Sequence, residues 1–230
     1  MPPPDETISW IGGIDAAAAP QNIAYLADLD DPALRAAIQL PPNMEDRARA
    51  MTYGEAARER FLSRRAVLRQ LLAARLGCPV ESVAVGTDDF GAPRLSAPLT
   101  RVPHFLSISA RGAFAAFAIA ERPIGIDIEI LGEPEPVPQD ALHADEAARL
   151  MALNEAGRHE AFLEIWTVKE AYFKALRTGL AREPNEVKTQ RGPDATVYII
   201  DRGAQVAAQA TLHKFRRRVS TTIIAACVTL

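Results

Sequence analysis

Features typical of secreted, membrane-spanning and metal-thiolate proteins are scarce in this 230-residue chain. Its two cysteines, Cys78 and Cys227, are far apart, so neither a disulfide framework nor a thiolate metal site is indicated. No apolar run approaches the roughly 20 residues needed to span a bilayer, and residues 1–6 contain neither a basic n-region nor an apolar h-region. We therefore expect a cytoplasmic protein that has no membrane partner.

A strong charge of either sign is also missing. The formal net charge is −3, and no long basic block predicts nucleic acid as a partner. With 48% hydrophobic residues, the chain can bury a sizeable core in one large domain or two small ones. Composition therefore restricts the class of protein but says little about its chemistry.

Residues 123–130 read as an apolar strand that carries two acids. Isoleucines at every second position alternate with Gly125, Asp127 and Glu129, so the isoleucines lie on one face and both acids on the other. Two like charges roughly 7 Å apart repel unless water, a cation or a basic side chain stands between them. Oxygen ligands of this kind suit Mg²⁺. Taken alone, the pattern also fits an edge strand with a solvated acidic face.

Residues 158–176 are predicted to form a helix with an acid and two lysines in its second half. Its apolar stripe consists of Phe162, Ile165, Trp166, Tyr172, Phe173 and Leu176. Lys169 falls inside this stripe, where structural support by pairing with an acid and contact with a ligand are equally open. Glu170 and Lys174 flank the stripe four residues apart and could form only a weak surface ion pair. Gly179 is expected to cap the helix.

The strand and the helix together resemble the signature of the 4′-phosphopantetheinyl transferases, a G-[IV]-D-[IV]-E strand followed by a W-x-x-K-E-[AS]-x-x-K helix. Residues 125–129 match the first element throughout. The second is matched by Trp166, Lys169, Glu170, Ala171, Lys174, Gly179 and Leu180. The chain length resembles that of the larger, pseudo-twofold subfamily that activates peptide and polyketide synthetases, rather than the half-sized trimeric type, so we expect a monomer.

The resemblance implies an α+β fold made of two similar α/β halves, which we expect to meet near residue 112. Residues 1–112 would bind the phosphates of coenzyme A, and residues 113–230 would bind Mg²⁺ and carry catalysis. The implied reaction transfers the 4′-phosphopantetheine arm of coenzyme A to a serine of an apo acyl or peptidyl carrier protein and releases 3′,5′-ADP.

The resemblance also implies roles for the signature residues. Mg²⁺ is the expected cofactor, with Asp127, Glu129 and Glu170 as its ligands. Lys174, together with Lys169, would neutralise pyrophosphate oxygens. Glu170 would accept the serine proton, either directly or through a metal-bound water.

Residues 58–72 are similar to the basic helix of the same family. In that helix Arg60 would reach the 3′-phosphate of coenzyme A, and Arg47 falls at another such basic position; planar guanidinium groups suit phosphate. The alternative is a solvated basic face, because apolar residues recur at helical spacing and would form core, leaving the arginines outside. These apolar residues are Phe61, Leu68, Leu71 and Leu72.

Two positions depart from the family pattern. The family's G-K-P turn is here Gly91-Ala92-Pro93, which lacks the lysine. Residues 104–109 keep Ser107, an expected coenzyme-binding residue, but have Ile108 where the family has a phosphate-binding histidine. Losing two charge-assisted hydrogen bonds without replacement would weaken coenzyme binding by about two to four orders of magnitude.

Nearby basic residues could replace these ligands. Arg94, Arg101 and Arg111 all lie close in sequence. Arg111 is the best candidate for the phosphate contact because it is three residues from Ile108 and just precedes Gly112. His104 would serve if the register shifts, although a histidine beside a proline is more typical of a turn.

Hydrophobic periodicity predicts the remaining elements. Helices are expected at 45–53, 55–76, 145–153 and 158–176, and strands at 23–29, 80–85, 106–109, 114–120, 124–130, 197–200, 205–214 and 221–228. Residues 88–93 should form a turn and residues 132–138 an extended loop.

Three functions stay open on the sequence alone. The chain could be a working transferase, which we favour because all three acids and Lys174 are present. It could be a non-catalytic relative that binds a carrier protein or a nucleotide. It could also be another Mg²⁺-dependent enzyme of phosphate esters, although that alternative has no motif of its own.

Overall fold

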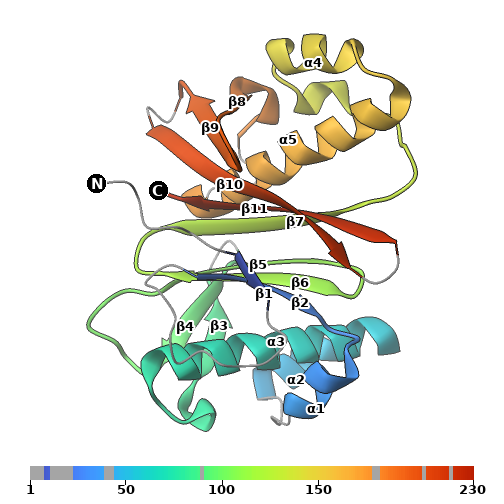
Figure 1. The fold of residues 1–230 in the computed structure, drawn as a ribbon. Coiled ribbons are helices and arrows are strands. Elements are labelled where there is room, and N and C mark those ends of the chain that lie inside the picture. The colour runs from blue at the N-terminus through green and yellow to red at the C-terminus, as the bar shows by residue number, and fades with distance from the viewer. Residues whose placement is uncertain are drawn as a thin grey trace. The chain divides into compact units, whose positions relative to one another are not determined.

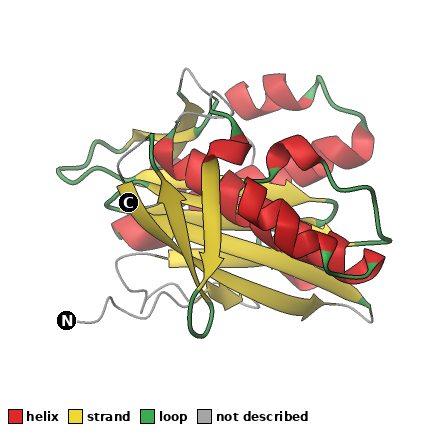
Figure 2. Ribbon diagram, turned by 90° about the horizontal axis from the view of Figure 1, so that it is seen from above, coloured by secondary structure: helices red, strands yellow, loops and turns green. Residues whose placement is uncertain are grey.

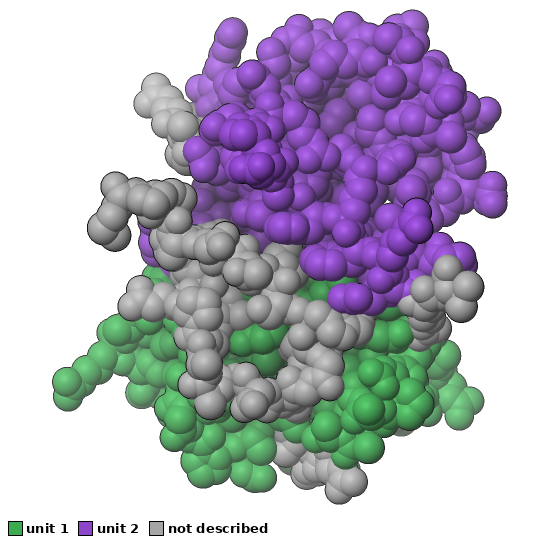
Figure 3. All heavy atoms as spheres, in the orientation of Figure 1, with its two compact units in different colours: residues 1–121 green, residues 122–230 purple. Residues whose placement is uncertain are grey.

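The computed structural model describes residues 8–10, 23–38, 44–88, 91–177, 182–203, 206–217 and 220–230. Contacts within the chain divide it into two compact units, residues 1–121 and 122–230 (Figure 3). We expected the halves to meet near residue 112, but Gly112 lies in the tight turn between two paired strands, with a φ of 55°. The division therefore falls nine residues later, after the second of these strands.

Among its described residues, the first unit is a six-stranded sheet with three α-helices (Figure 1). Its strands are β1 (Ile8–Trp10), β2 (Ile23–Asp28), β3 (Ala84–Thr87), β4 (Pro93–Ala97), β5 (Phe105–Arg111) and β6 (Phe114–Ala120), and its helices are α1 (Pro32–Ala37), α2 (Met44–Ala50) and α3 (Glu55–Leu76). The strand order is β1-β2-β6-β5-β4-β3, antiparallel except for the parallel pair β1 and β2.

The second unit is a five-stranded antiparallel sheet with one long helix along it (Figures 1 and 2). Its strands are β7 (Ile124–Leu131), β8 (Val187–Arg191), β9 (Thr196–Asp201), β10 (Val206–Arg217) and β11 (Thr221–Thr229), and its helices are α4 (Ala144–Met151) and α5 (Glu155–Leu176). The strand order is β7-β11-β10-β9-β8. Helix α5 packs against β7 and β11.

The two units share one topology. Apart from β1 at the edge of the first sheet, the first strand of each unit pairs antiparallel with the last strand, and the remaining strands follow in reverse chain order: β2-β6-β5-β4-β3 and β7-β11-β10-β9-β8. Each also has one helix of 22 residues, α3 or α5, that ends in a left-handed residue, Gly77 or Arg177. The predicted α+β fold of two similar halves is confirmed, although the sequence shows no clear repeat.

Most predicted elements are present, with a few corrections. Helix α3 and strand β6 have the predicted bounds, whereas α1, β1, β4 and β8 were not predicted. The predicted strand at 80–85 is wrong in its first half, where Val80–Ser82 forms a 3₁₀ helix. The predicted cap Gly179 lies outside the described residues, and the left-handed residue seen at the end of α5 is Arg177.

The solvated basic face considered for α3 is wrong for two of its arginines. Arg65 and Arg69 are buried. Arg65 Nε bonds to Asp46 Oδ1 at 2.6 Å, and Arg69 Nε donates to the Val83 carbonyl at 3.0 Å. These arginines therefore fix α3 to α2 and to the segment before β3. None of the helices within the described ranges is long and apolar enough to cross a bilayer.

Candidate active site on β7 and α5

Gly125 is the point at which α5 approaches β7 most closely. A Cβ atom added at Gly125 would lie 1.9 Å from the Ala171 carbonyl oxygen and 2.5 Å from the Ala175 nitrogen. Glycine is therefore required here because the helix backbone occupies the space of a side chain. This contact brings the second half of α5, which carries the other signature residues, onto the face of β7 that bears the acids.

Asp127 lies two residues further along the same face of β7. It is 1% exposed, and its Oδ1 accepts a hydrogen bond from Lys174 Nζ of α5 at 2.6 Å. The Lys174 side chain is 30% exposed, so a buried carboxylate is paired with a lysine whose side chain is partly exposed. Lys174 thus has Asp127 of β7 as an ion-pair partner, which its four-residue spacing from Glu170 did not suggest.

Glu129 borders a cleft of about 500 Å³ within the second unit. Helix α5 lines the cleft with Phe162, Leu163 and Trp166. Two segments that flank α5 in sequence also line it, and we call them its walls: Pro138, Asp140 and Ala141 form one, and Arg182, Glu183 and Pro184 form the other. By strand geometry the isoleucines of β7 lie on the face opposite Gly125 and Asp127, and Ile124, Ile126 and Ile128 are buried there.

Glu170 occupies the helix position midway between Trp166 and Lys174. The three residues are four apart and share one side of α5. The side chain of Glu170 is half-buried. The helix therefore carries an aromatic residue of the cleft, a carboxylate and the ammonium that binds Asp127 in one line.

The carboxylates suit Mg²⁺ in chemistry but are not gathered into a closed site. Within the part of the chain that the structure describes, no three His, Cys, Asp or Glu side chains lie close enough to hold a metal ion. The donors are hard oxygens, and buried Asp127 already binds a cation, the Lys174 ammonium, at 2.6 Å. The donor chemistry of these residues suits Mg²⁺, but in this arrangement the neighbour of Asp127 is the Lys174 ammonium, so a metal site here stays a prediction.

Lys169 does not face solvent. It is 0% exposed, and its Nζ donates to Glu146 Oε2 at 2.6 Å, to the Pro184 carbonyl at 2.8 Å and to the Ala141 carbonyl at 3.0 Å. Burial lowers the pKa of Lys169, and the hydrogen bond and charge of Glu146 oppose that shift. Of the two roles open for Lys169, the structure favours structural support over ligand contact. The position of Lys169 in an apolar stripe indicates that it needs an acid partner, but no sequence pattern identifies Glu146 as that partner.

The basic residues predicted to bind the 3′-phosphate lie in the first unit. Arg60 of α3 bonds to Asp30 through Nη2 at 3.0 Å and Nε at 3.4 Å, and Arg35 shares the same carboxylate at 2.9 Å. Arg47 of α2 is exposed. Arg60 thus uses its guanidinium fork on a carboxylate, the group that phosphate would have to replace.

In and just before β5, the residues considered for the coenzyme phosphates lie in the core, on the surface and in a turn. Ser107 is buried, and Ile108 packs against the core of the first unit. Arg111 is exposed at the end of β5, where its Nη1 donates to the Ala110 carbonyl at 3.3 Å. His104 Nδ1 lies 3.0 Å from the Val102 carbonyl, which fits a turn residue. Compensation by Arg111 stays a prediction.

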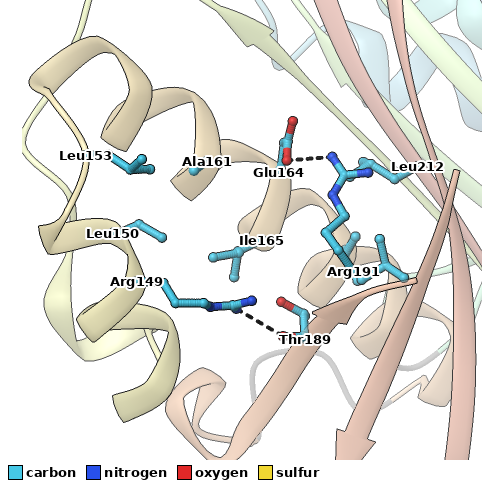
Figure 4. A pocket seen from close by; sticks show the side chains of 11 residues that line it. Arg149, Leu150, Leu153, Ala161, Glu164, Ile165, Thr189, Arg191 and Leu212 are labelled. Atoms are coloured by element: carbon cyan, nitrogen blue, oxygen red, sulfur yellow. Dashed lines mark hydrogen bonds and ion pairs between the residues drawn. The ribbon is translucent and has the colours of Figure 1, made fainter. Parts of the chain in front are cut away.

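A second cavity, of about 230 Å³, lies between α4, α5 and strands β8 to β10 (Figure 4). It is mainly apolar, and two arginines stand at its rim. Arg149 Nη2 donates to the Thr189 carbonyl at 3.2 Å, and Arg191 pairs with Glu164 at 2.6 Å. None of the predicted site residues lines this cavity, so it is separate from the acidic cleft.

Comparison with known proteins agrees with the arrangement on β7 and α5. Residues 123–227 match the family model of the 4′-phosphopantetheinyl transferase superfamily. The matched region begins just before β7 and ends within β11, so it covers nearly the whole second unit. The predicted site residues Asp127, Glu129, Glu170 and Lys174 all lie inside it.

Several curated proteins are similar over longer stretches. The chain is 29% identical over 197 residues to the 4′-phosphopantetheinyl transferase psf-1 of Bacillus pumilus, which covers 80% of this chain and 81% of that protein. It is 29% identical over 115 residues to gsp of Aneurinibacillus migulanus, covering 50% of this chain and 46% of that protein. It is 30% identical over 129 residues to HetI of Nostoc, covering 54% of each. The chain thus spans about half the length of gsp and HetI in these matches.

Proposed function

We propose that this chain, which belongs to the 4′-phosphopantetheinyl transferase superfamily, transfers the 4′-phosphopantetheine arm of coenzyme A to a serine of an apo acyl or peptidyl carrier protein. The observation that carries the proposal is the pair formed by buried Asp127 and half-exposed Lys174 across the contact of β7 and α5. A carboxylate and an ammonium held together in this way offer binding groups for both a metal ion and a phosphate.

The reaction sets clear requirements. The serine oxygen attacks the β-phosphorus of coenzyme A, forming the new P–O bond, while the pyrophosphate P–O bond breaks and 3′,5′-ADP leaves. Positioning and charge stabilisation dominate the barrier of such a transfer. In the proposal Lys174 binds pyrophosphate oxygens, and Glu170 accepts the proton of the serine hydroxyl.

Asp127, Glu129 and Glu170 would hold Mg²⁺. When bound, this ion supplies electrostatic stabilisation of the charge on the transferring phosphate. Because Asp127 already pairs with Lys174, ion binding requires the Lys174 ammonium to shift toward the phosphate. Calorimetric titration with MgCl₂ in the presence of coenzyme A tests this, with Asp127→Asn as the variant that should lose the ion. Equal Mg²⁺ binding by Asp127→Asn and the unaltered protein would refute the assignment of the ligands.

In the first unit, Arg47, Arg60, Ser107 and Arg111 are proposed to bind the coenzyme phosphates. For Arg60 this requires exchange of the Asp30 carboxylate for the 3′-phosphate, since both groups match the guanidinium fork. The fully buried Lys169 is not assigned to the phosphates.

Incubation with a panel of apo carrier proteins, coenzyme A and Mg²⁺ tests the function directly. Mass spectrometry should detect one added phosphopantetheinyl group on the carrier serine. Coenzyme A binding without modification of any carrier would favour the non-catalytic relative. Turnover in excess chelator would contradict the metal requirement.

A further inference from the structure

Lys169 is a signature residue that the proposed mechanism does not use. Its ammonium is fully buried and donates three hydrogen bonds, to Glu146 Oε2 and to the carbonyl oxygens of Ala141 and Pro184. An ammonium group has three protons, so these bonds use its whole donor capacity. The question is what the two carbonyl bonds achieve.

The two carbonyls belong to the two walls of the cleft at Glu129, which contact each other. Ala141 ends the 3₁₀ helix Gln139–Ala141, which precedes α4, and Pro184 begins the 3₁₀ helix Pro184–Glu186, which follows α5. Both residues line the cleft. Because Lys169 is itself on α5, which also lines the cleft, one ammonium ties both walls to this helix.

Side-chain contacts other than those of Lys169 also hold the wall that contains Pro184. Arg182, beside Pro184, bonds through Nη2 to Asp201 Oδ1 at 2.7 Å, and the same buried Asp201 accepts from Tyr172 Oη at 2.9 Å. A Cβ atom at Gly203 would lie 2.2 Å from Arg182 Nη2, so a glycine leaves room for this arginine. The wall that follows α5 is thus held at two points, one of which is Lys169.

We infer that Lys169 is a positioning residue: it fixes the two walls of the cleft at Glu129, and so sets the shape of the space next to the acidic site. That the cleft serves the reaction rests on the proposed function. That Lys169 holds its walls does not, and the two parts can be tested separately.

The variants must separate wall positioning from the buried charge pair. Lys169→Met alone leaves the Glu146 carboxylate buried without its counter-ion, which is strongly destabilising. The double variant Lys169→Met/Glu146→Gln removes both charges, and its glutamine keeps an oxygen for the Thr189 amide, which donates to Glu146 Oε1 at 2.7 Å. The double variant should therefore fold while still lacking both wall bonds.

Thr189→Val is the matched control. The Thr189 hydroxyl donates to Glu146 Oε1 at 2.7 Å, so this substitution removes one bond of the same buried network. It leaves all three bonds of Lys169 in place. Thr189 borders the second cavity and not the cleft at Glu129 (Figure 4).

Hydrogen–deuterium exchange measures the walls directly. In the double variant, backbone amides of residues 139–142 and 185–187 should exchange about tenfold faster than in the unaltered protein, the scale of one lost hydrogen bond at each wall. In Thr189→Val their exchange should be unchanged. Unchanged exchange at both walls in the double variant would overturn the positioning role.

Kinetics decide whether the walls matter for the reaction. With a carrier protein that the unaltered protein modifies, kcat/KM of the double variant should fall about tenfold to a hundredfold, mainly through KM, since the walls are released while Glu170 and Lys174 stay on α5. Faster exchange with unchanged kcat/KM would overturn the link to the reaction. If the unaltered protein modifies no carrier, the proposed function fails, and the exchange result alone decides the positioning role.

Discussion

Gly125 offers the sharpest test of how the site is built, because a single added methyl group meets backbone on the facing helix. In Gly125→Ala the new Cβ would start 1.9 Å from the Ala171 carbonyl oxygen, whereas ordinary contact begins at 3.4 Å. The atoms in the way belong to the α5 backbone, so no side-chain rotation relieves the clash. Either β7 or α5 must move by more than 1 Å.

Such a movement should reduce both stability and activity. Overpacking of a dense core costs about 1–3 kcal/mol, and we expect about 3 kcal/mol because the obstacle is backbone. The same shift would pull Lys174 away from Asp127, whose contact is 2.6 Å. Misplacement of about 1 Å can cost about a hundredfold in rate, so kcat should fall on that scale.

Urea unfolding followed by circular dichroism, with carrier modification as the activity assay, measures both effects. Gly132→Ala is the matched control: it lies just after β7, has no atom within 4 Å of the added Cβ and has no positive φ. It should stay within about 0.5 kcal/mol of the unaltered protein. If Gly125→Ala is as stable and active as Gly132→Ala, the reasoning about the contact of β7 and α5 is refuted.

Three further predictions concern single side chains. Glu170→Gln should change the free energy of unfolding by less than about 0.5 kcal/mol but lower turnover far more; normal turnover with normal coenzyme binding would make Glu170 a surface residue only. Arg111→Ala should raise the Kd for coenzyme A about tenfold, with a smaller effect on dephospho-coenzyme A, and calorimetry that finds equal binding would eliminate the compensation for Ile108. Burial lowers the pKa of His213 below 6.5, so the unfolded chain takes up its proton first and stability falls as the pH drops below about 6.5. His213→Gln should lose less stability in that range, as measured by urea midpoints at about pH 7.5 and about pH 5, and an identical loss would contradict the assignment.

The elements that were predicted correctly are those whose hydrophobic periodicity is visible within the element itself. The bounds of α3 and β6 follow from long apolar periodicity and flanking glycines, and the alternation in β7 placed Asp127 and Glu129 on one face. The strand expected over residues 80–85 begins only at Ala84, because Arg69 takes the carbonyls of Val80 and Val83 as acceptors. A side chain 11 or 14 residues away competes with sheet pairing there, and no local signal shows it.

The burial of Arg65 in α3 can be read from its position in the helix. Arg65 follows Phe61 by four residues and precedes Leu68 by three, so it falls within the apolar stripe of the helix. The same reasoning had marked Lys169 of α5 as a residue in need of an acid. What sequence could not supply is the partner, since Asp46 and Glu146 lie 19 and 23 residues away from their bases.

These two pairs explain how one topology can occur twice without a sequence repeat. In each unit, a buried base on the long helix binds an acid on the preceding short helix: Arg65 binds Asp46, and Lys169 binds Glu146. Each base also donates to a backbone carbonyl beyond the end of its own helix. The residues differ but the connection is the same, so the fold is maintained by equivalent contacts and not by identical residues.

The acids of the site have no such counterpart. The strand that corresponds to β7 in the first unit is β2, an apolar strand with buried Leu26 and no acid before its last residue, Asp28. Shared topology and shared base–acid pairs therefore account for the scaffold of both units but not for chemistry in both. The proposed chemistry follows from what is specific to the second unit: a glycine that lets α5 lie on β7, and the pair of Asp127 and Lys174 that forms across this contact. Loss of activity on changing Asp127 or Lys174 should thus leave the first unit's fold and its proposed coenzyme contacts intact.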